Sequence, residues 1–570
     1  MRIRRLAALA LLNLLNNLLH AWHLIAVLER NFNSILRSIH FPTIFSNTMD
    51  GEGGEQRDPI EQAQAEPMEE DIEDQVVMGL GYEDESGDED DVDEEEDDNA
   101  SDMSSDSDSD YIVEMDSDDA FESDNAAGYG GDYSTNSESD SEVGNKTFRS
   151  HWNLDPRYSV PNVPLYTFKP QRLLKCNYKK FCPPRDYPFA RSGHRVVASE
   201  SHLYTLGGYN PRNSRTIARG TGMLFQELWR YNFATKRWVL LHNPTTNRNM
   251  PRELASNALI ISNNLLISYG GTGYPFGESC SNDCYIYQTQ GEKPSVMRIE
   301  ATGDAPIPQY GPGIVLHEHY LYTIGGTTGY DYSCDVHRLN LRTRVWECVY
   351  ICRPDIREDP EGRYRHEVVY DGEYIYVLGG GTSHLVYDLQ RIPAFNLKTN
   401  RWEYFDTLPD RTFLTNAAIA RQNSGFPKPR KCFSCVQHTK SNGEVEAFIT
   451  GGMLRDHVYF SDIWKLNFST KQWTLIRTAS LPKALYFHAA AHNQNGCMYI
   501  FGGIEYDEKR IRRCNDLYKM WMTVPKLSEI CWEAVLHYRP NLKFNGHSQL
   551  LKMGIPLRFA QRLWHSSKTK

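Results

Sequence analysis

The side chains best placed to do chemistry in this chain are arginines, which recur in loops that follow pairs of glycine residues and in segments that precede an apolar strand. Guanidinium groups hold a carboxylate through two parallel hydrogen bonds, and a nearby hydroxyl can complete the cradle. Each charge taken alone is equally well explained as the charge of a solvated loop. If several such loops converge at one end of the fold, which we call the mouth, they favour a basic pocket there. The residues expected to line it are Arg191, Ser192, Arg212, Arg215, Arg365, Arg455 and Arg510.

Nucleic acid is the rival ligand for a basic surface. The charges are scattered along the chain, and no RNA- or DNA-binding motif accompanies them. We therefore expect a carboxylate-bearing protein segment as the ligand, and neither nucleic acid nor a membrane as a partner.

Catalysis is not expected. The sequence has no phosphate-binding glycine loop, dinucleotide fingerprint, zinc-protease motif or nucleophile elbow. The nearest approach to metal-ligand spacing, Cys432-x2-Cys435-x2-His438, lacks the second half of a zinc framework. We predict no catalytic residue, no metal and no cofactor. A structural role is favoured for four histidines that recur near the start of successive repeat units: His194, His366, His438 and His488.

A second constellation, near the C-terminus, is suited to binding a partner. Leu527, Cys531 and Val535 are four residues apart, so on a helix they share one face. Two short apolar stripes must pack on the rest of the chain or be covered by another protein. The second stripe has the same four-residue spacing and consists of Ile555, Phe559 and Leu563. Pro556 is suited to the first turn of that helix.

Helix-breaking residues divide this C-terminal region. Pro540 and Gly554 interrupt it, which predicts three short helices. Their expected ranges are 525–538, 547–553 and 556–564.

The elements that must position these residues come from an internal repeat. An apolar, aromatic strand followed by a glycine pair occurs six times, at intervals of 51 to 72 residues. Units of about fifty residues with four short strands are typical of propeller blades. The glycine pairs begin at Gly207, Gly270, Gly325, Gly379, Gly451 and Gly502.

A second signature follows four of the six glycine pairs. It reads Asn-[Leu/Phe]-x-Thr-x-x-Trp, in which Asn and Thr suit a turn and Trp begins the outer strand. The four instances end at Trp238, Trp346, Trp402 and Trp473. Together with the glycine pairs this signature resembles the kelch repeat, over about residues 186–522. The expected fold is all-β, a six-bladed kelch β-propeller with a short C-terminal helical box and a disordered acidic N-terminal region.

Two strands fall outside the regular pattern. The sixth unit lacks a fourth strand, and Val163–Phe168 is expected to supply it from before the first unit. In the second unit, which has no Trp, Val296–Ile299 is expected to be the outer strand.

The C-terminal stripes add a functional resemblance. The Leu527, Cys531 and Val535 spacing resembles an elongin-binding box, and the segment from Ile555 to Leu563 resembles a cullin-2 box. Their order behind a propeller resembles kelch-domain substrate receptors of cullin-2 RING ubiquitin ligases. The resemblance implies that elongin B/C and cullin-2 with its RING subunit are partners, and that the mouth takes substrates by their C-terminal tails. A kelch scaffold, whose helices merely pack on the ring, is the alternative.

Composition sets the region before the propeller apart. From Asp50 to Glu142 the chain has 38 acidic residues and one basic residue, Arg57. Such a stretch cannot bury enough apolar surface to fold, so we expect disorder. The whole chain has a formal net charge of −13, so the remainder is strongly basic.

The expected domains are 1–48, 49–148, 160–522 and 523–566. The first is apolar after three arginines and resembles a signal peptide or anchor. Met49 is the preferred start site, which makes the first domain an alternative or mistaken extension. Twelve cysteines without a disulfide-like framework suit reduced thiols in the cytoplasm or nucleus.

Overall fold

The structure, a computed structural model, describes seven stretches of the chain. They are residues 164–182, 186–212, 223–289, 295–415, 425–455, 457–507 and 510–564. The expected domains 1–48 and 49–148 and Arg215 lie outside them. None of the described helices is long and apolar enough to cross a membrane.

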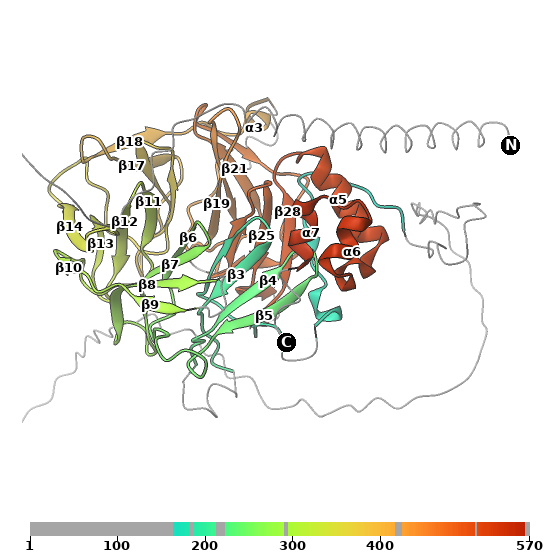
Figure 1. Cartoon of the computed structure of the whole chain (residues 1–570). Helices are drawn as coiled ribbons and strands as arrows, with labels where there is room; N and C mark the ends of the chain where they lie inside the picture. The colour runs from blue at the N-terminus through green and yellow to red at the C-terminus, as the bar shows by residue number, and fades with distance from the viewer. Residues whose placement is uncertain are drawn as a thin grey trace, which may run out of the picture. The chain divides into compact units, whose positions relative to one another are not determined.

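Six antiparallel sheets form the body, and each corresponds to one glycine pair (Figure 1). Blade 1 contains β2 (Arg195–Ala198), β3 (His202–Leu206), β4 (Leu228–Asn232) and β5 (Arg237–His242). Blade 2 contains β6 (Ala258–Ser262), β7 (Leu265–Thr272), β8 (Cys280–Gln288) and β9 (Val296–Arg298). Blade 3 contains β11 (Gly313–His317), β12 (Tyr320–Thr327), β13 (Tyr332–Asn340) and β14 (Val345–Tyr350), with β10 (Thr302–Gly303) parallel to β14.

The other three blades follow the same order. Blade 4 contains β15 (Glu367–Tyr370), β16 (Tyr374–Leu378), β17 (Arg391–Asn396) and β18 (Arg401–Asp406). Blade 5 contains β19 (Ser434–Thr439), β20 (Val445–Thr450), β21 (Ile463–Asn467) and β22 (Gln472–Leu475). Blade 6 contains β24 (Ala489–His492), β25 (Cys497–Phe501), β28 (Leu517–Trp521) and β1 (Leu174–Lys175). A small sheet of β23 (Ala484–Tyr486), β26 (Ile504–Asp507) and β27 (Arg510–Arg513) extends from blade 6.

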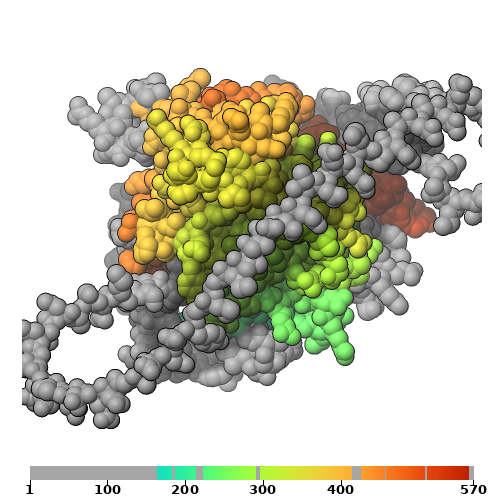
Figure 2. All heavy atoms as spheres, turned by 90° about the vertical axis from the view of Figure 1, so that its left-hand side faces the viewer, coloured from blue at the N-terminus to red at the C-terminus, as the bar shows by residue number. Residues whose placement is uncertain are grey.

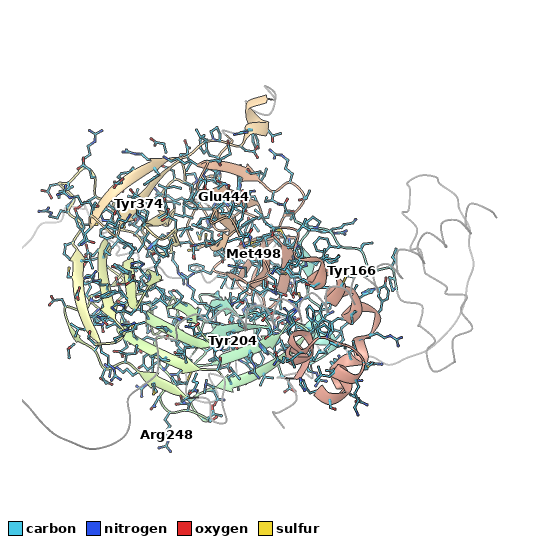
Figure 3. The ribbon with its side chains drawn as sticks, turned by 45° about the horizontal axis from the view of Figure 1, so that its top comes forward. Tyr166, Tyr204, Arg248, Tyr374, Glu444 and Met498 are labelled. Atoms are coloured by element: carbon cyan, nitrogen blue, oxygen red, sulfur yellow. The ribbon has the colours of Figure 1, made fainter. Side chains whose placement is uncertain are left out.

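The six first strands close a ring. Each inner strand contacts the inner strands of both neighbouring blades, and the cycle returns from β24 to β2. Figure 3 shows the blades arranged around a common axis. The predicted six-bladed propeller is therefore confirmed, as is the outer strand of blade 2, since β9 pairs with β8.

The strand that closes blade 6 differs from the predicted one. β1 pairs antiparallel with β28, placing Leu174 opposite Lys519. The prediction of Val163–Phe168 was wrong: its first residue is not described, and the rest runs beside the C-terminal helices, where Figure 3 places Tyr166. The Tyr166 N–H donates to the hydroxyl of Tyr538 at 2.8 Å, and the Tyr166 hydroxyl donates to Glu533 at 2.9 Å. Because these helices engage the segment, ring closure uses residues further along the chain.

A ring of backbone hydrogen bonds joins the blades at the axis. Six residues contribute, one just before each inner strand, and all have positive φ. Each N–H donates to the carbonyl of the equivalent residue in the preceding blade at 2.8 to 3.3 Å, and the first donates to the last at 3.0 Å. This axial ring fixes the inner ends of the blades at one depth. Its members are Gly193, Ser256, Gly311, Arg365, Cys432 and Phe487.

The glycine pairs are required because neighbouring chains approach them closely. A Cβ on Gly207 or on Gly451, each the first of its pair, would lie 2.2 Å from a carbonyl oxygen of the next blade. A Cβ on Gly380 or on Gly503, each the second of its pair, would lie 2.6 Å from a histidine Cβ of its own blade. No larger side chain fits at these positions.

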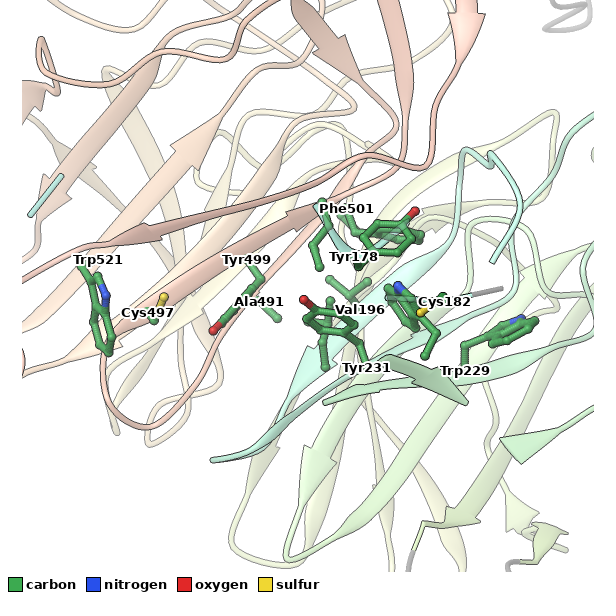
Figure 4. Packing of buried hydrophobic residues seen from close by; sticks show 14 residues of the cluster. Tyr178, Cys182, Val196, Trp229, Tyr231, Ala491, Cys497, Tyr499, Phe501 and Trp521 are labelled. Atoms are coloured by element: carbon green, nitrogen blue, oxygen red, sulfur yellow. The ribbon is translucent and has the colours of Figure 1, made fainter. Parts of the chain in front are cut away.

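The Asn-to-Trp signature also has the predicted role. Asn232 and Asn396 each accept two backbone N–H groups through Oδ1, at 2.8 to 3.1 Å, in the turn between the third and fourth strands. The four tryptophans are at most 4% exposed and pack between sheets. Figure 4 shows one such interface, where Tyr178, Tyr231 and Phe501 join blade 6 to blade 1.

The C-terminal region forms helices as predicted. They are α5 (Leu527–Tyr538), η3 (Pro540–Phe544), α6 (His547–Lys552) and α7 (Leu557–Trp564). They lie beside β28 and β4, on one side of the ring (Figure 1). Seen from the side of blade 3, they appear only at the far edge of the molecule (Figure 2).

Candidate functional site

One face of the propeller gathers the segments that enter the inner strands and the loops that follow the glycine pairs. Backbone bridges join them, for example Ser192 to Tyr209 and Tyr364 to Gly381. We call this face the mouth. The turns between first and second strands, and between third and fourth strands, lie on the opposite face because successive strands are antiparallel.

Arg191 does not line the mouth as an open cation. It is fully buried, and its guanidinium donates to the carbonyl oxygens of Phe189 and Gly207 and to Glu227. Arg363 and Arg430 do the same, each bonding the carbonyl two residues earlier and the first glycine of its own pair. Recurrence in three blades marks a structural arginine of the repeat. The prediction of Arg191 as a substrate contact is corrected, because its side chain is fully buried and each of its three guanidinium nitrogens already donates a hydrogen bond within the repeat.

Arg365 lies at the axis. It belongs to the axial ring, and its guanidinium donates to the hydroxyl of Ser256 and lies 4.5 Å from the Phe487 ring centroid. Those residues belong to blades 2 and 6, so the Arg365 side chain crosses the axis from blade 4. It is 7% exposed, and its Nε has no hydrogen-bond partner among the described residues. Burial lowers the pKa of the Arg365 guanidinium, so this group would gain from a carboxylate partner.

A second pair fills the axis one layer deeper. Arg195 on β2 and Glu367 on β15 form an ion pair at 2.6 Å. It joins blade 1 to the blade directly opposite. Each side chain is 16% exposed, and Arg195 also donates to the carbonyl of Asn257. The charges of Arg195 and Glu367 thus compensate each other within the ring, whereas Arg365 has no carboxylate partner among the described residues.

The remaining predicted residues are divided. Ser192 is buried, and its hydroxyl accepts a hydrogen bond from Arg513 at 2.8 Å. Arg212, Arg455 and Arg510 are exposed on segments that follow glycine pairs. The structure thus brings Arg365 to the centre and leaves these three arginines at the rim.

Aromatic residues around the mouth were not predicted. Tyr209 stacks on Tyr274 with ring centroids 5.3 Å apart, and Tyr459 stacks on Tyr486 at 4.8 Å. Arg513 lies 4.8 Å from the Tyr209 centroid. Tyr209 had a signal in the sequence, because it directly follows a glycine pair, whereas Tyr274 and Tyr459 lie further along the loops after their glycine pairs. The mouth is therefore aromatic as well as basic.

One face of the C-terminal helices is fastened to the propeller. Glu533 on α5 pairs with Lys519 on β28 at 2.5 Å. Burial disfavours both charges, but each partner outweighs it, so the pKa of Glu533 is lowered and that of Lys519 is raised. Arg562 on α7 pairs with Glu529 at 2.7 Å and with Glu200 of blade 1. The helices thus dock on blades 6 and 1, at the face of the propeller opposite the mouth.

The two predicted stripes have different fates. Leu527 is 53% exposed, and Cys531 and Val535 are partly buried on the same helix. Phe559 and Leu563 are 1% and 2% exposed, in a core with Trp532, whose ring stacks on Phe559 at 5.0 Å. Of the two alternatives left open by the sequence, packing within the chain therefore holds for Phe559 and Leu563 of the second stripe, which fold the helices together. Ile555 and Pro556 keep part of their surface.

Three of the four predicted histidines are structural. The Nε2 atoms of His194 and His366 lie 3.0 and 3.1 Å from the carbonyls of Phe501 and Ile324, and that of His488 lies 2.8 Å from the Thr450 hydroxyl. Each partner immediately precedes a glycine pair of the preceding blade. His438 lies instead within β19, and Phe433 takes the equivalent place in blade 5.

These histidines predict a pH-dependent stability. Burial lowers the pKa of both His366 and His488 to about 3. The unfolded chain takes up these protons near pH 6.5, so the stabilisation is complete above that pH and is lost as the pH falls toward 3. Urea unfolding at pH 5.5 should show about 1.4 kcal/mol less stability per histidine than at pH 7.5. A His488→Gln variant should show a smaller pH difference by that amount; an unchanged difference would contradict the assignment.

Among the described residues, no group of three or more His, Cys, Asp or Glu side chains could hold a metal ion.

Comparison with known proteins shows which proteins this chain is similar to. Two family models match: the "KLHDC2/KLHL20/DRC7 Kelch-repeats domain" over residues 193–413 and the "Attractin/LZTR1 beta-propeller" over residues 321–530. Kelch domain-containing protein 10 homolog of Drosophila melanogaster is 64% identical over 406 residues, 70% of this chain and 66% of that protein, just under two thirds. Kelch domain-containing protein 10 of Xenopus laevis is 44% identical over 66% of this chain and 87% of its own length; that of Homo sapiens is 42% identical over 66% and 80%.

Proposed function

This chain belongs to the family of kelch domain-containing protein 10, and from that premise we propose that it is the substrate-recognition subunit of a cullin-2/elongin BC ubiquitin ligase. In this role it has no catalytic residue of its own. The propeller binds the substrate, and the C-terminal helices bind elongin B/C and cullin-2.

The observation that carries the proposal is the arrangement of α5. One side of this helix is fixed to β28 and α7 through Glu533 and Glu529, while Leu527 on another side is 53% exposed. An apolar side chain held outward on a rigidly docked helix is suited to a partner's groove. Val524, just before α5, and Leu557, the first residue of α7, are also exposed, at 69% and 52%.

The mouth supports capture of a substrate's C-terminus. Arg365 offers a buried cation whose Nε has no partner in the described part of the chain. A chain end brings the carboxylate that such a group lacks, and the neighbouring tyrosines offer apolar surface for the residues before it. Substrate tails that end in a small residue such as Gly or Ala would let the carboxylate reach the axis.

Amidation tests this capture. A fluorescent peptide ending in Gly and selected from co-purified substrates should bind the full chain, and the same peptide with a C-terminal amide should bind at least about tenfold more weakly, because a charge-assisted hydrogen bond is lost. Fluorescence anisotropy measures both affinities. Equal affinity for acid and amide would refute carboxylate capture.

The second candidate is a kelch scaffold without a ligase role. It is favoured by the burial of Phe559 and Leu563, because half of the stripes are explained by folding alone. Affinity purification of the full chain with mass spectrometry separates the two: elongin B/C and cullin-2 must co-purify if it is a ligase subunit, and their absence would leave the scaffold.

A further inference from the structure

A cluster of cations lies at the seam between the propeller and the C-terminal helices. The Lys236 ammonium lies 5.5 Å from the centroid of the Phe181 ring, and the Lys543 ammonium lies 4.5 Å from the same centroid. Arg237 follows Lys236 at the start of β5. We call Lys236, Arg237, Lys543 and Phe181 the seam cluster. It draws on blade 1, on η3 and on the segment that precedes blade 1.

The seam cluster has no counter-ion in the described part of the chain. No carboxylate there forms an ion pair with Lys236, Arg237 or Lys543. The carboxylates of Asp516 and Glu533, on neighbouring elements, pair with other lysines: Asp516 with Lys175 at 2.5 Å and Lys179 at 3.8 Å, and Glu533 with Lys519 at 2.5 Å.

The cations also repel one another. Burial lowers the pKa of Lys543, and the charges of Arg237 and Lys236 lower it further; the pKa of Lys236 is lowered by burial and by Lys519. Like charges held together on an aromatic ring are relieved when an anion binds among them.

We propose that the seam cluster is a docking site for the acidic segment Ser101–Glu142 of the same chain. This segment carries 14 Asp and Glu residues and neither Lys nor Arg, so its charge complements the cluster. It lies 21 residues before Pro164, where the described chain begins. A linker of that length spans about 70 Å when extended, which reaches any point on a body of this size.

Docking in cis needs only weak contacts. A tether holds the segment at an effective concentration in the millimolar range, so exposed ion pairs of modest strength are sufficient. Binding at the seam, opposite the mouth, would also keep the acidic segment away from the arginines of the mouth. The proposal does not depend on a ligase role.

Zero-length carbodiimide crosslinking of the full chain tests this docking, because it joins lysine ammonium groups to carboxylates in contact. At about 50 mM salt we expect crosslinks from Ser101–Glu142 to Lys236 and Lys543 to exceed those to Lys428 and Lys526, two exposed lysines elsewhere, by about tenfold. At 0.5 M salt the excess should disappear.

Variants give the control. R237A/K543A should lower the crosslink yield at Lys236 several-fold, whereas K526A should not change it; both proteins should melt at the wild-type temperature. An even spread of crosslinks over exposed lysines would overturn the proposal, as would an unchanged yield in R237A/K543A. Binding of a 20-nucleotide poly-uridine that K236A/K543A abolishes, without crosslinks to the acidic segment, would assign the cluster to nucleic acid and also overturn it.

Discussion

Replacing Leu527 with aspartate is expected to abolish co-purification of elongin B/C and to leave the propeller folded. Leu527 is half exposed on α5 and has no place in the core of the C-terminal helices. A carboxylate introduced into an apolar groove remains without a partner, and the cost of several kcal/mol corresponds to a loss of more than about 100-fold in affinity. Pulldown from cells measures the association, and thermal unfolding of the purified chain measures the fold.

Two variants frame this result. Phe544→Asp alters another exposed apolar residue of the same region, 67% exposed, and should keep elongin B/C bound. Phe559→Ala removes a buried ring that stacks on Trp532 and should destabilise the C-terminal helices by about 3 to 5 kcal/mol. Retention of elongin B/C by Leu527→Asp would reject α5 as the docking helix. Unfolding of the propeller by Leu527→Asp would make the helix purely structural.

Replacing Arg365 with methionine is expected to weaken binding of a peptide carboxylate by about 10- to 100-fold. The guanidinium supplies a charge-assisted hydrogen bond in a buried place, where such a bond contributes about 1.5 to 3 kcal/mol. Methionine has a similar length, and the substitution keeps the backbone hydrogen bond of the axial ring in which the N–H of residue 365 donates to the carbonyl of Gly311. Anisotropy titrations with the acid and amide forms of one peptide give the affinity ratio.

The control for Arg365 is Arg455→Met, which removes an exposed arginine from the rim. Solvent screens that charge, so affinity should fall by no more than a few-fold. In Arg365→Met the acid and amide peptides should bind alike. If the acid form still binds tenfold better, the carboxylate is held elsewhere.

The fold could be predicted from the sequence because the same structural requirements recur in each repeat and select the same residue types. Gly207 and Gly380 admit no Cβ, so the glycine pair returns with every blade, and Asn232 and Asn396 each accept the backbone N–H groups of a tight turn that recurs in four of them. The closing strand was mispredicted because β1 has two residues and almost no pattern. The apolar segment before β1, which includes Tyr166, has a more strand-like sequence, but the Tyr166 hydroxyl donates to Glu533 on α5 instead.

The mouth was harder to predict because residue type does not reveal burial. Arg191 and Arg365 look alike in the sequence. In the structure, however, Arg191 donates to the carbonyl of Gly207 in its own blade, whereas the side chain of Arg365 crosses the axis to Phe487. Phe559 and Leu527 likewise each belong to a stripe with four-residue spacing. The docking of α7 against α5 through Arg562 and Glu529 makes Phe559 a core residue and leaves Leu527 exposed.

The pairing of β1 with β28 also sets a schedule for biosynthesis. Lys175 and Asp516, which form an ion pair beside that pairing, are 341 positions apart in the chain. At about 5 to 20 residues per second, the ribosome needs roughly 17 to 70 s between them. During that interval the early segment of blade 6 has no strand to join, and its apolar residues are open to chaperones. Closure of the circle is thus a late event, completed only when the last blade emerges, and the nascent protein acquires its mouth and its C-terminal helices together.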